Sequence, residues 1–184
     1  MLAIAENTFA QKLVAAAKAS GHPWPGYIAA AAFLESAAYA SADGESGLAE
    51  HTDDILGLKE PSWWKGQVYD ENTREVLAGV SVMEPADWPV FPTLEAAFAA
   101  GYTVLKSMPS TYGEALAAHS GDEFIRLVSA SWLAGDALPA STAHPVIHFP
   151  SGSYQFKAGR WSTDPNRASS VLEVYDSHPN IFAA

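Results

Sequence analysis

The sequence predicts a single, mainly α-helical domain with one small antiparallel β-lobe. Apolar residues recur at helical spacing in several separate segments. A stretch at about residues 63–92 instead mixes Val, Tyr and Thr with turn residues, which is typical of short paired strands. The length of 184 residues allows one sizeable core but is short for two ordinary domains. We therefore expect residues 1–184 to fold as one unit.

The first helix is predicted over residues 8–20. Thr8 and Gln11 have the spacing of a capping box, and apolar residues then recur at helical intervals. Gly21 and Pro23 interrupt this pattern, so the helix is expected to end just before them.

The second helix is predicted over residues 26–38, with Pro25 suited to its first position. The residues at positions i, i+3, i+4 and i+7 of this helix are Ile28, Ala31, Ala32 and Glu35. Because this spacing places side chains on one helix face, Glu35 is expected on the apolar face, close to the helix end.

The middle of the chain is predicted to contain a loop, the β-lobe and a long helix. Residues 44–59 show no regular period and are expected to form the loop. The turn of the β-lobe is expected at Leu77-Ala78-Gly79. Thr93 is then expected to cap a helix that keeps its apolar residues on one face as far as Leu105.

Shorter helices are predicted toward the C-terminus. Thr111 is expected to cap one helix and Asp122 to cap a second, which ends near Gly135. Residues 136–161 break the helical period and are expected to form an inserted surface loop or hairpin. Asp164, followed by a proline, is expected to cap the last helix.

The charge balance excludes several kinds of partner. Ten basic and 21 acidic side chains give a net charge of −11, which repels phosphate backbones and anionic lipid surfaces. Nucleic acid is therefore not expected as a ligand, and any affinity for a glycan must come from aromatic stacking and hydrogen bonds. No apolar stretch approaches the roughly 20 residues that span a bilayer.

The chain is expected to act as a monomer.

Two further features concern the setting in which the protein acts. With no cysteine there is neither a disulfide nor a thiolate metal site. Residues 1–6 lack the basic start and the apolar run of a secretion signal. If the protein is exported, we expect another route or a segment that is removed.

Glu35 is the main candidate for chemistry. A carboxylate on an apolar helix face has lost water, which disfavours its charged form and suits it to act as a general acid. The ordinary alternative is a carboxylate at the edge of the core that pairs with a basic side chain or with the backbone. Position alone favours this alternative.

Cleavage of a glycosidic bond usually needs a second carboxylate on a facing element. Glu75 in the β-lobe is the candidate, because alternate side chains of a strand would face the cleft; the ordinary alternative is a solvated strand carboxylate. Other acids in the same region are Glu71, Glu84 and Asp87. Glu45 competes with Glu35 for the role of the acid and ranks second, because no apolar helical run precedes it. The six His residues show no metal-ligand spacing, so neither a metal nor a cofactor is expected.

Several segments occur in an order that is found in a known family. Residues 32–36 end in Glu-Ser, and residues 46–48 form a Ser-x-Leu pair. Residues 53–59 read Asp-Asp-Ile-Leu-Gly-Leu-Lys, similar to a family motif Asn-Asn-Leu-Phe-Gly-Ile-Lys.

Three more segments follow in the same order. Residues 73–76 are similar to Thr-x-Glu-Tyr, residues 88–91 to Phe-Arg-x-Tyr, and residues 161–168 to Tyr-Ala-Thr-Asp-Pro-x-Tyr-Ala. Over most of its length the chain thus resembles the glucosaminidase domains of glycoside hydrolase family 73, which hydrolyse peptidoglycan.

The resemblance implies a lysozyme-like helical domain with a β-lobe that hydrolyses the β-1,4 bond after N-acetylglucosamine. It implies that Glu35 is the proton donor and, less directly, that Glu75 assists, since the 2-acetamido group of the substrate could assist instead. The residues expected to bind the glycan are Tyr39, Asp54, Trp88, Phe91, Trp161 and Asp164. The partner would be peptidoglycan strands, in the periplasm or the extracellular cell wall.

The chain also departs from the family pattern. Residues 37–39 replace Gly-Trp-Gly, and the pair Asp53-Asp54 replaces two Asn. Trp161 and Arg167 stand where the last motif has Tyr, so a hydroxyl needed there would come from elsewhere, for example from Tyr154.

Two other functions fit these features. A muramidase or lytic transglycosylase needs only the single acid and cuts the neighbouring bond. A protein of a different class, such as a glycan-binding, phage-tail or secretion component, would keep the cleft without turnover, and the replaced Tyr positions favour it.

Overall fold

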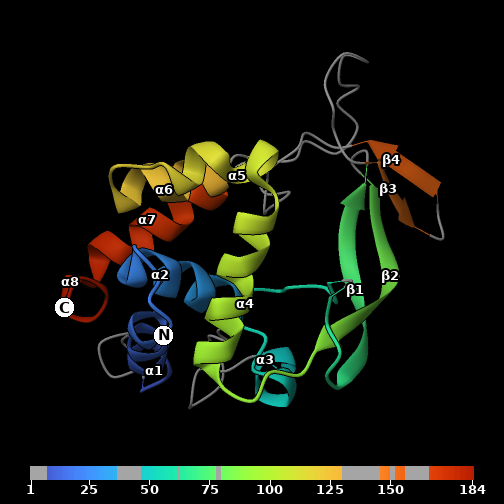
Figure 1. The fold of residues 1–184 in the computed structure, drawn as a ribbon, viewed down its shortest axis with the longest axis horizontal. Coiled ribbons are helices and arrows are strands. Elements are labelled where there is room, and N and C mark those ends of the chain that lie inside the picture. The colour runs from blue at the N-terminus through green and yellow to red at the C-terminus, as the bar shows by residue number, and fades with distance from the viewer. Residues whose placement is uncertain are drawn as a thin grey trace.

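The computed structural model describes residues 8–36, 47–61, 63–77, 80–129, 146–149, 152–155 and 166–184. The helices in these ranges are α1 (Thr8–Ala19), α2 (Pro25–Ser36), α3 (Gly47–Thr52), α4 (Leu94–Ser107), α5 (Pro109–Leu116), α6 (Gly121–Val128), α7 (Arg167–Ser177) and α8 (Pro179–Phe182). The strands are β1 (Val68–Leu77), β2 (Val80–Pro89), β3 (Val146–Phe149) and β4 (Gly152–Gln155). The helices form one body, and the β1–β2 hairpin lies to one side of it (Figure 1).

Helix α2 forms the centre of the helical body. It contacts α1, α6, α7 and α8, and every residue from Ile28 to Phe33 is buried. A helix that is apolar on all sides is stable only when it is surrounded, and its four alanines in a row let the neighbours approach closely. At Gly26 an added Cβ would lie 1.8 Å from the carbonyl oxygen of Phe182, so α8 passes directly over the start of α2.

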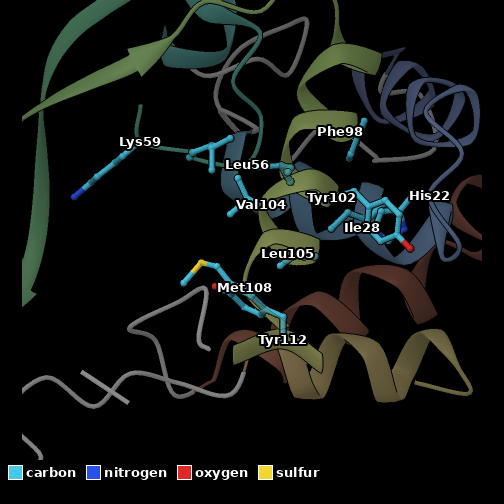
Figure 2. Close-up of a pocket in the computed structure, with 13 residues that line it drawn as sticks. His22, Ile28, Leu56, Lys59, Phe98, Tyr102, Val104, Leu105, Met108 and Tyr112 are labelled. Carbon is cyan, nitrogen blue, oxygen red and sulfur yellow. The ribbon is translucent and has the colours of Figure 1, made fainter. Parts of the chain in front are cut away.

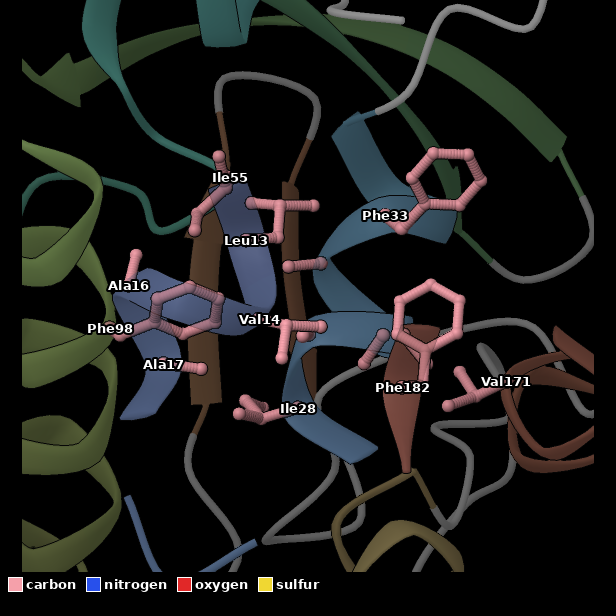
Figure 3. Close-up of a cluster of buried hydrophobic side chains, with 14 of the residues drawn as sticks. Leu13, Val14, Ala16, Ala17, Ile28, Phe33, Ile55, Phe98, Val171 and Phe182 are labelled. Atoms are coloured by element: carbon pink, nitrogen blue, oxygen red, sulfur yellow. The ribbon is translucent and has the colours of Figure 1, made fainter. Parts of the chain in front are cut away.

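Large side chains from the surrounding helices complete the core. The largest fully buried aromatic residues are Phe9, Phe33, Phe98, Phe124 and Phe182. Figure 3 shows Leu13 and Phe98 on one side of α2, and Val171 and Phe182 on the other. Burying a side chain of this size stabilises the fold by roughly 1.5–3 kcal/mol, so this core holds α2 rigidly. None of the described helices combines the length and the apolar character that crossing a membrane requires.

The predicted β-lobe is confirmed. Strands β1 and β2 pair antiparallel from Val68 opposite Pro89 to Leu77 opposite Val80. The expected turn residues Ala78 and Gly79 lie outside the described residues, between the two paired ends.

Backbone hydrogen bonds tie the base of this hairpin to the helical body. The N–H of Phe91 donates to the carbonyl oxygen of Thr52, at the end of α3, at 2.7 Å. The N–H of Val90 donates to the carbonyl oxygen of Gln67 at 2.9 Å. The loop between α3 and β1 is thereby fixed at both of its ends.

The expectation of a loop over residues 44–59 is wrong for residues 47–52, which form α3. This helix has only six residues, too few to show a helical period in the sequence. Tertiary packing decides it, because Ala49 and Thr52 are both buried.

Two predicted helix caps are also wrong. Thr111 lies inside α5, which begins at Pro109, because proline fits the first helical position. Asp122 lies in the first turn of α6, and the N-cap is Ser120, whose Oγ accepts from the N–H of Glu123 at 3.1 Å. Ser and Asp are both good caps, and the spacing to Glu123 identifies the serine.

Within residues 136–161, strands β3 and β4 pair antiparallel, which confirms the hairpin alternative for that segment. The N-cap of helix α7 is Asn166 and its first residue is Arg167, so the expectation that Asp164 caps this helix is wrong; Asp164 itself lies outside the described residues. The short helix α8 was not predicted.

Candidate active site

Glu35 lies in the last turn of α2. Ala31, Ala32 and Phe33, which precede it in α2, are buried. The side chain of Glu35, in contrast, is 32% exposed. The expectation that it lies in an apolar environment is therefore wrong. The helix carries the carboxylate out of the core and leaves it at the surface.

Arg167 is the partner of Glu35. It opens α7, only 8% of it is exposed, and its guanidinium lies 2.7 Å from Oε1 of Glu35. The same guanidinium nitrogen donates to the carbonyl oxygen of Ala31 at 3.0 Å. A buried guanidinium is tolerated when its donors are satisfied in this way. Glu35 is thus paired with a basic side chain, the feature that the ordinary alternative for this residue predicted.

Asp54, one of the residues expected to bind the glycan, is buried and only 2% exposed. Its Oδ1 accepts from the N–H of Leu56 at 3.2 Å and of Leu58 at 3.1 Å. The pKa of Asp54 is raised to about 7, mainly by burial; backbone hydrogen bonds act in the opposite direction, and the negative charge of Glu35 adds to the increase. Oδ2 has no hydrogen-bond partner within the described part of the chain. Asp54 therefore shapes the loop and is not open to a sugar in this conformation.

A cavity of about 350 Å³ is lined in part by residues 56–59 of this loop. The start of α2, the helix α4, the start of α5 and residues 56–59 surround it. Figure 2 shows Lys59 extending from this wall toward the β1–β2 hairpin. Gly101 lets α4 approach the loop, since an added Cβ would lie 2.5 Å from Cδ1 of Leu56. The volume is in the range of a pocket for a small ligand or a sugar unit.

His22 is one of the residues that line this cavity. Its Nδ1 accepts from the N–H of Trp24 at 3.1 Å, so its proton is assigned to Nε2, which has no partner among the residues described. Burial lowers the pKa of His22 to about 4. The ring is packed against Tyr102 and Phe124, with centroids 5.0 and 5.2 Å away. It is therefore neutral near pH 7.

The aromatic residues expected to line the sugar subsites are placed differently. Trp88 is 6% and Phe91 4% exposed; the indole N–H of Trp88 donates to the carbonyl oxygen of Glu71 at 3.1 Å. Neither ring offers an open face to a sugar here. Trp63, in contrast, is 42% exposed, so its ring is accessible to a sugar. It packs edge-on against Trp64. The adjacent Trp pair was the sequence signal for this position.

The remaining predicted site residues are not tested by the geometry. The backbone of Glu75 pairs with Val82 near the end of the hairpin, and the position of its side chain lies outside the description. Tyr39, Trp161 and Asp164 also lie outside the described residues. Within the described ranges there is no group of three His, Cys, Asp or Glu residues able to hold a metal ion.

No family model and no curated protein matches the chain. Solved structures are similar to it. The catalytic domain of the autolysin Auto from Listeria monocytogenes has a TM-score of 0.62 at 18% identity, covering 100% of this chain and 89% of that one. A peptidoglycan hydrolase mutant from Sphingomonas sp. A1 has a TM-score of 0.59 at 17% identity, covering 91% of each chain.

A truncated glycoside hydrolase domain of FlgJ from Salmonella typhimurium has a TM-score of 0.54 at 19% identity, covering 95% of this chain and 97% of that one. At these identities the likeness establishes the fold. The predicted fold, a lysozyme-like helical domain with a small β-lobe, is confirmed.

Proposed function

We propose that this protein is a peptidoglycan hydrolase that cleaves the β-1,4 bond after N-acetylglucosamine, with Glu35 as the general acid. The observation that carries the proposal is the placement of Glu35. It is a partly exposed carboxylate at the end of the central buried helix, fixed by a buried guanidinium, in a fold shared with domains named as peptidoglycan or glycoside hydrolases.

In this mechanism Glu35 gives its proton to the leaving glycosidic oxygen. Arg167 holds the carboxylate in one orientation and also stabilises the anion that remains after transfer. Glu75 assists at the anomeric centre, or the 2-acetamido group of the substrate takes that role. The glycan runs between the helical body and the β-lobe, where Trp63 supplies a stacking face. Tyr39, Trp161 and Asp164 are further proposed contacts.

This substrate places the action of the protein at the cell wall, in the periplasm or outside the cell. The charge of −11 keeps it away from anionic surfaces, so we propose that binding depends on stacking and hydrogen bonds. We propose that the protein works as a monomer.

Digestion of purified peptidoglycan, followed by mass spectrometry of the new reducing ends, tests the proposal. We expect fragments that end in reducing N-acetylglucosamine. Reducing or anhydro muramic acid ends would instead identify a muramidase or a lytic transglycosylase.

Binding without release of fragments across a broad pH range would identify a glycan-binding protein without turnover. That alternative gains support from the ion pair between Glu35 and Arg167, because a neighbouring positive charge favours the ionised carboxylate.

A further inference from the structure

We propose that Arg167 sets the upper pH limit of the proposed cleavage, because its positive charge holds Glu35 as a carboxylate until the solution is acidic enough to protonate it. The effect on turnover rests on the proposed function. The effect on the charge of Glu35 does not, and it can be measured without a substrate.

Arg167 and Glu35 are in direct contact. Nη2 of Arg167 lies 2.7 Å from Oε1 of Glu35, the distance of a charge-assisted hydrogen bond. The side chain of Arg167 is only 9% exposed, so water does little to screen its charge, whereas that of Glu35 is 32% exposed and can exchange protons with the solvent. A guanidinium does not lose its proton in proteins. Glu35 therefore faces a positive charge at every pH at which this fold persists.

The fold holds the guanidinium in this position. Nη2 also donates to the carbonyl oxygen of Ala31 at 3.0 Å, and Arg167 is the first residue of α7, which packs against α2. Moving the side chain away from Glu35 would leave a buried charge without its anion, which is strongly unfavourable. The ion pair is therefore a fixed part of the site.

Asp54 acts on Glu35 in the opposite direction, but more weakly. Its pKa is raised to about 7, first by burial and also by the negative charge of Glu35. The repulsion is mutual, so an ionised Asp54 favours the protonated form of Glu35. In acidic solution Asp54 is mostly neutral, whereas the guanidinium of Arg167 is charged and in contact. The positive charge therefore has the larger effect on Glu35 there.

The charged side chains on the other elements around α2 have partners of their own or are exposed. They are Lys12 of α1, which acts on Asp53, Lys18 of α1, which donates to the carbonyl oxygen of Ala184, Arg126 of α6, which pairs with Asp122, Glu123 of α6, which accepts from the N–H of His119, and the exposed Glu173 and Asp176 of α7. Helix α8 contains no charged residue. Arg167 is thus the cation that these described elements place against Glu35.

The sign of the pH dependence follows from this contact. A general acid must carry its proton when the reaction begins, and kcat/KM follows the fraction of free enzyme in that form. A neighbouring positive charge favours the ionised form, so this fraction falls at a lower pH than it would without Arg167. The protein should therefore cleave glycan best in acidic surroundings, and removal of the charge should extend its activity toward neutral pH.

The first test is the pH profile of kcat/KM on peptidoglycan for the wild type, Arg167→Gln and Arg167→Lys. Arg167→Gln removes the charge and keeps N–H donors, whereas Arg167→Lys keeps the charge and alters the shape. The pH at which kcat/KM falls to half its maximum on the alkaline side should rise by about one unit in Arg167→Gln and stay unchanged in Arg167→Lys. Equal alkaline limits in the wild type and Arg167→Gln, or an equal rise in both variants, would overturn the proposal.

Thermal unfolding at each pH checks that the variants remain folded. The check matters at the acidic end, because burial lowers the pKa of His22 from 6.5 to about 4, and the stability therefore falls as the pH drops through this interval. Arg167→Met is a second neutral variant and should show the same rise of the alkaline limit as Arg167→Gln.

The second test needs neither turnover nor a stable variant at position 167. The side-chain carboxyl carbons of the wild type are titrated by NMR, with Glu35→Gln to assign the signal of Glu35 and the exposed Glu173 as the reference. Glu35 should become half protonated at a lower pH than Glu173, and the same or a higher pH would contradict the proposed role of Arg167. A wild type that cleaves nothing, with Glu35 titrating as expected, would overturn the proposed function and leave the effect of Arg167 on the charge of Glu35 established.

Discussion

Glu35→Gln is expected to lower the rate of glycan cleavage by roughly 10²- to 10⁴-fold, the usual contribution of a general acid. The amide keeps the size of the side chain and can still accept from Arg167, but it has no proton to give to the leaving oxygen. Fold and glycan binding should therefore persist. Release of soluble fragments from purified peptidoglycan, measured per mole of enzyme, gives the rate.

The matched control is Glu173→Gln, which removes a carboxylate from an exposed position of α7. It should keep the wild-type rate. If Glu35→Gln retains more than about a tenth of the activity, Glu35 is not the general acid; the same substitution at Glu75 would then be the next experiment.

Arg167→Met is expected to lower the free energy of unfolding by about 2–4 kcal/mol, slightly less than the roughly 3–5 kcal/mol for breaking one side of a fully buried ion pair. The substitution leaves the carbonyl oxygen of Ala31 and the carboxylate of Glu35 without this guanidinium. Because Glu35 is partly exposed, water compensates for part of the loss. Urea unfolding at pH 7 measures the change.

Arg126→Met provides the comparison for this result. Arg126 pairs with Asp122 at 2.7 Å, but both side chains are largely exposed, and such a pair contributes at most about 1 kcal/mol. A similar loss in both variants would mean that the Glu35–Arg167 pair adds nothing beyond an ordinary surface ion pair.

The elements in which apolar residues recur at a regular spacing were predictable from the sequence. Helix α4 begins after Thr93, whose Oγ1 accepts from the N–H of Ala96 at 3.2 Å, as its sequence signal predicts. The β-lobe was predictable because its β-branched and aromatic residues flank a single turn. Helix α3 was not, because six residues held by tertiary packing leave no periodic signal.

The site was predictable only in part, because it depends on contacts between distant segments. The spacing wrongly predicted an apolar environment for Glu35. Its partner Arg167 lies far along the chain and reaches Glu35 only in the folded protein. Arg167 had a sequence signal, as one of the departures from the family motif, but its role required the fold.

The burial of Asp54 shows the same limit. An acid within a turn is usually solvated, whereas the fold leaves only 2% of Asp54 exposed. The family resemblance also implied that Trp88 and Phe91 are aromatic residues of the cleft, but it did not show that the fold buries both of them.

A crystal structure of Glu35→Gln with a bound N-acetylglucosamine-containing glycan oligomer tests the central claim most directly. The account predicts that a β-1,4 glycosidic oxygen lies within about 3 Å of the residue-35 side-chain amide, between the helical body and the β-lobe. An oligomer bound in that cleft with every glycosidic oxygen beyond the reach of residue 35, or bound on another face, would contradict it.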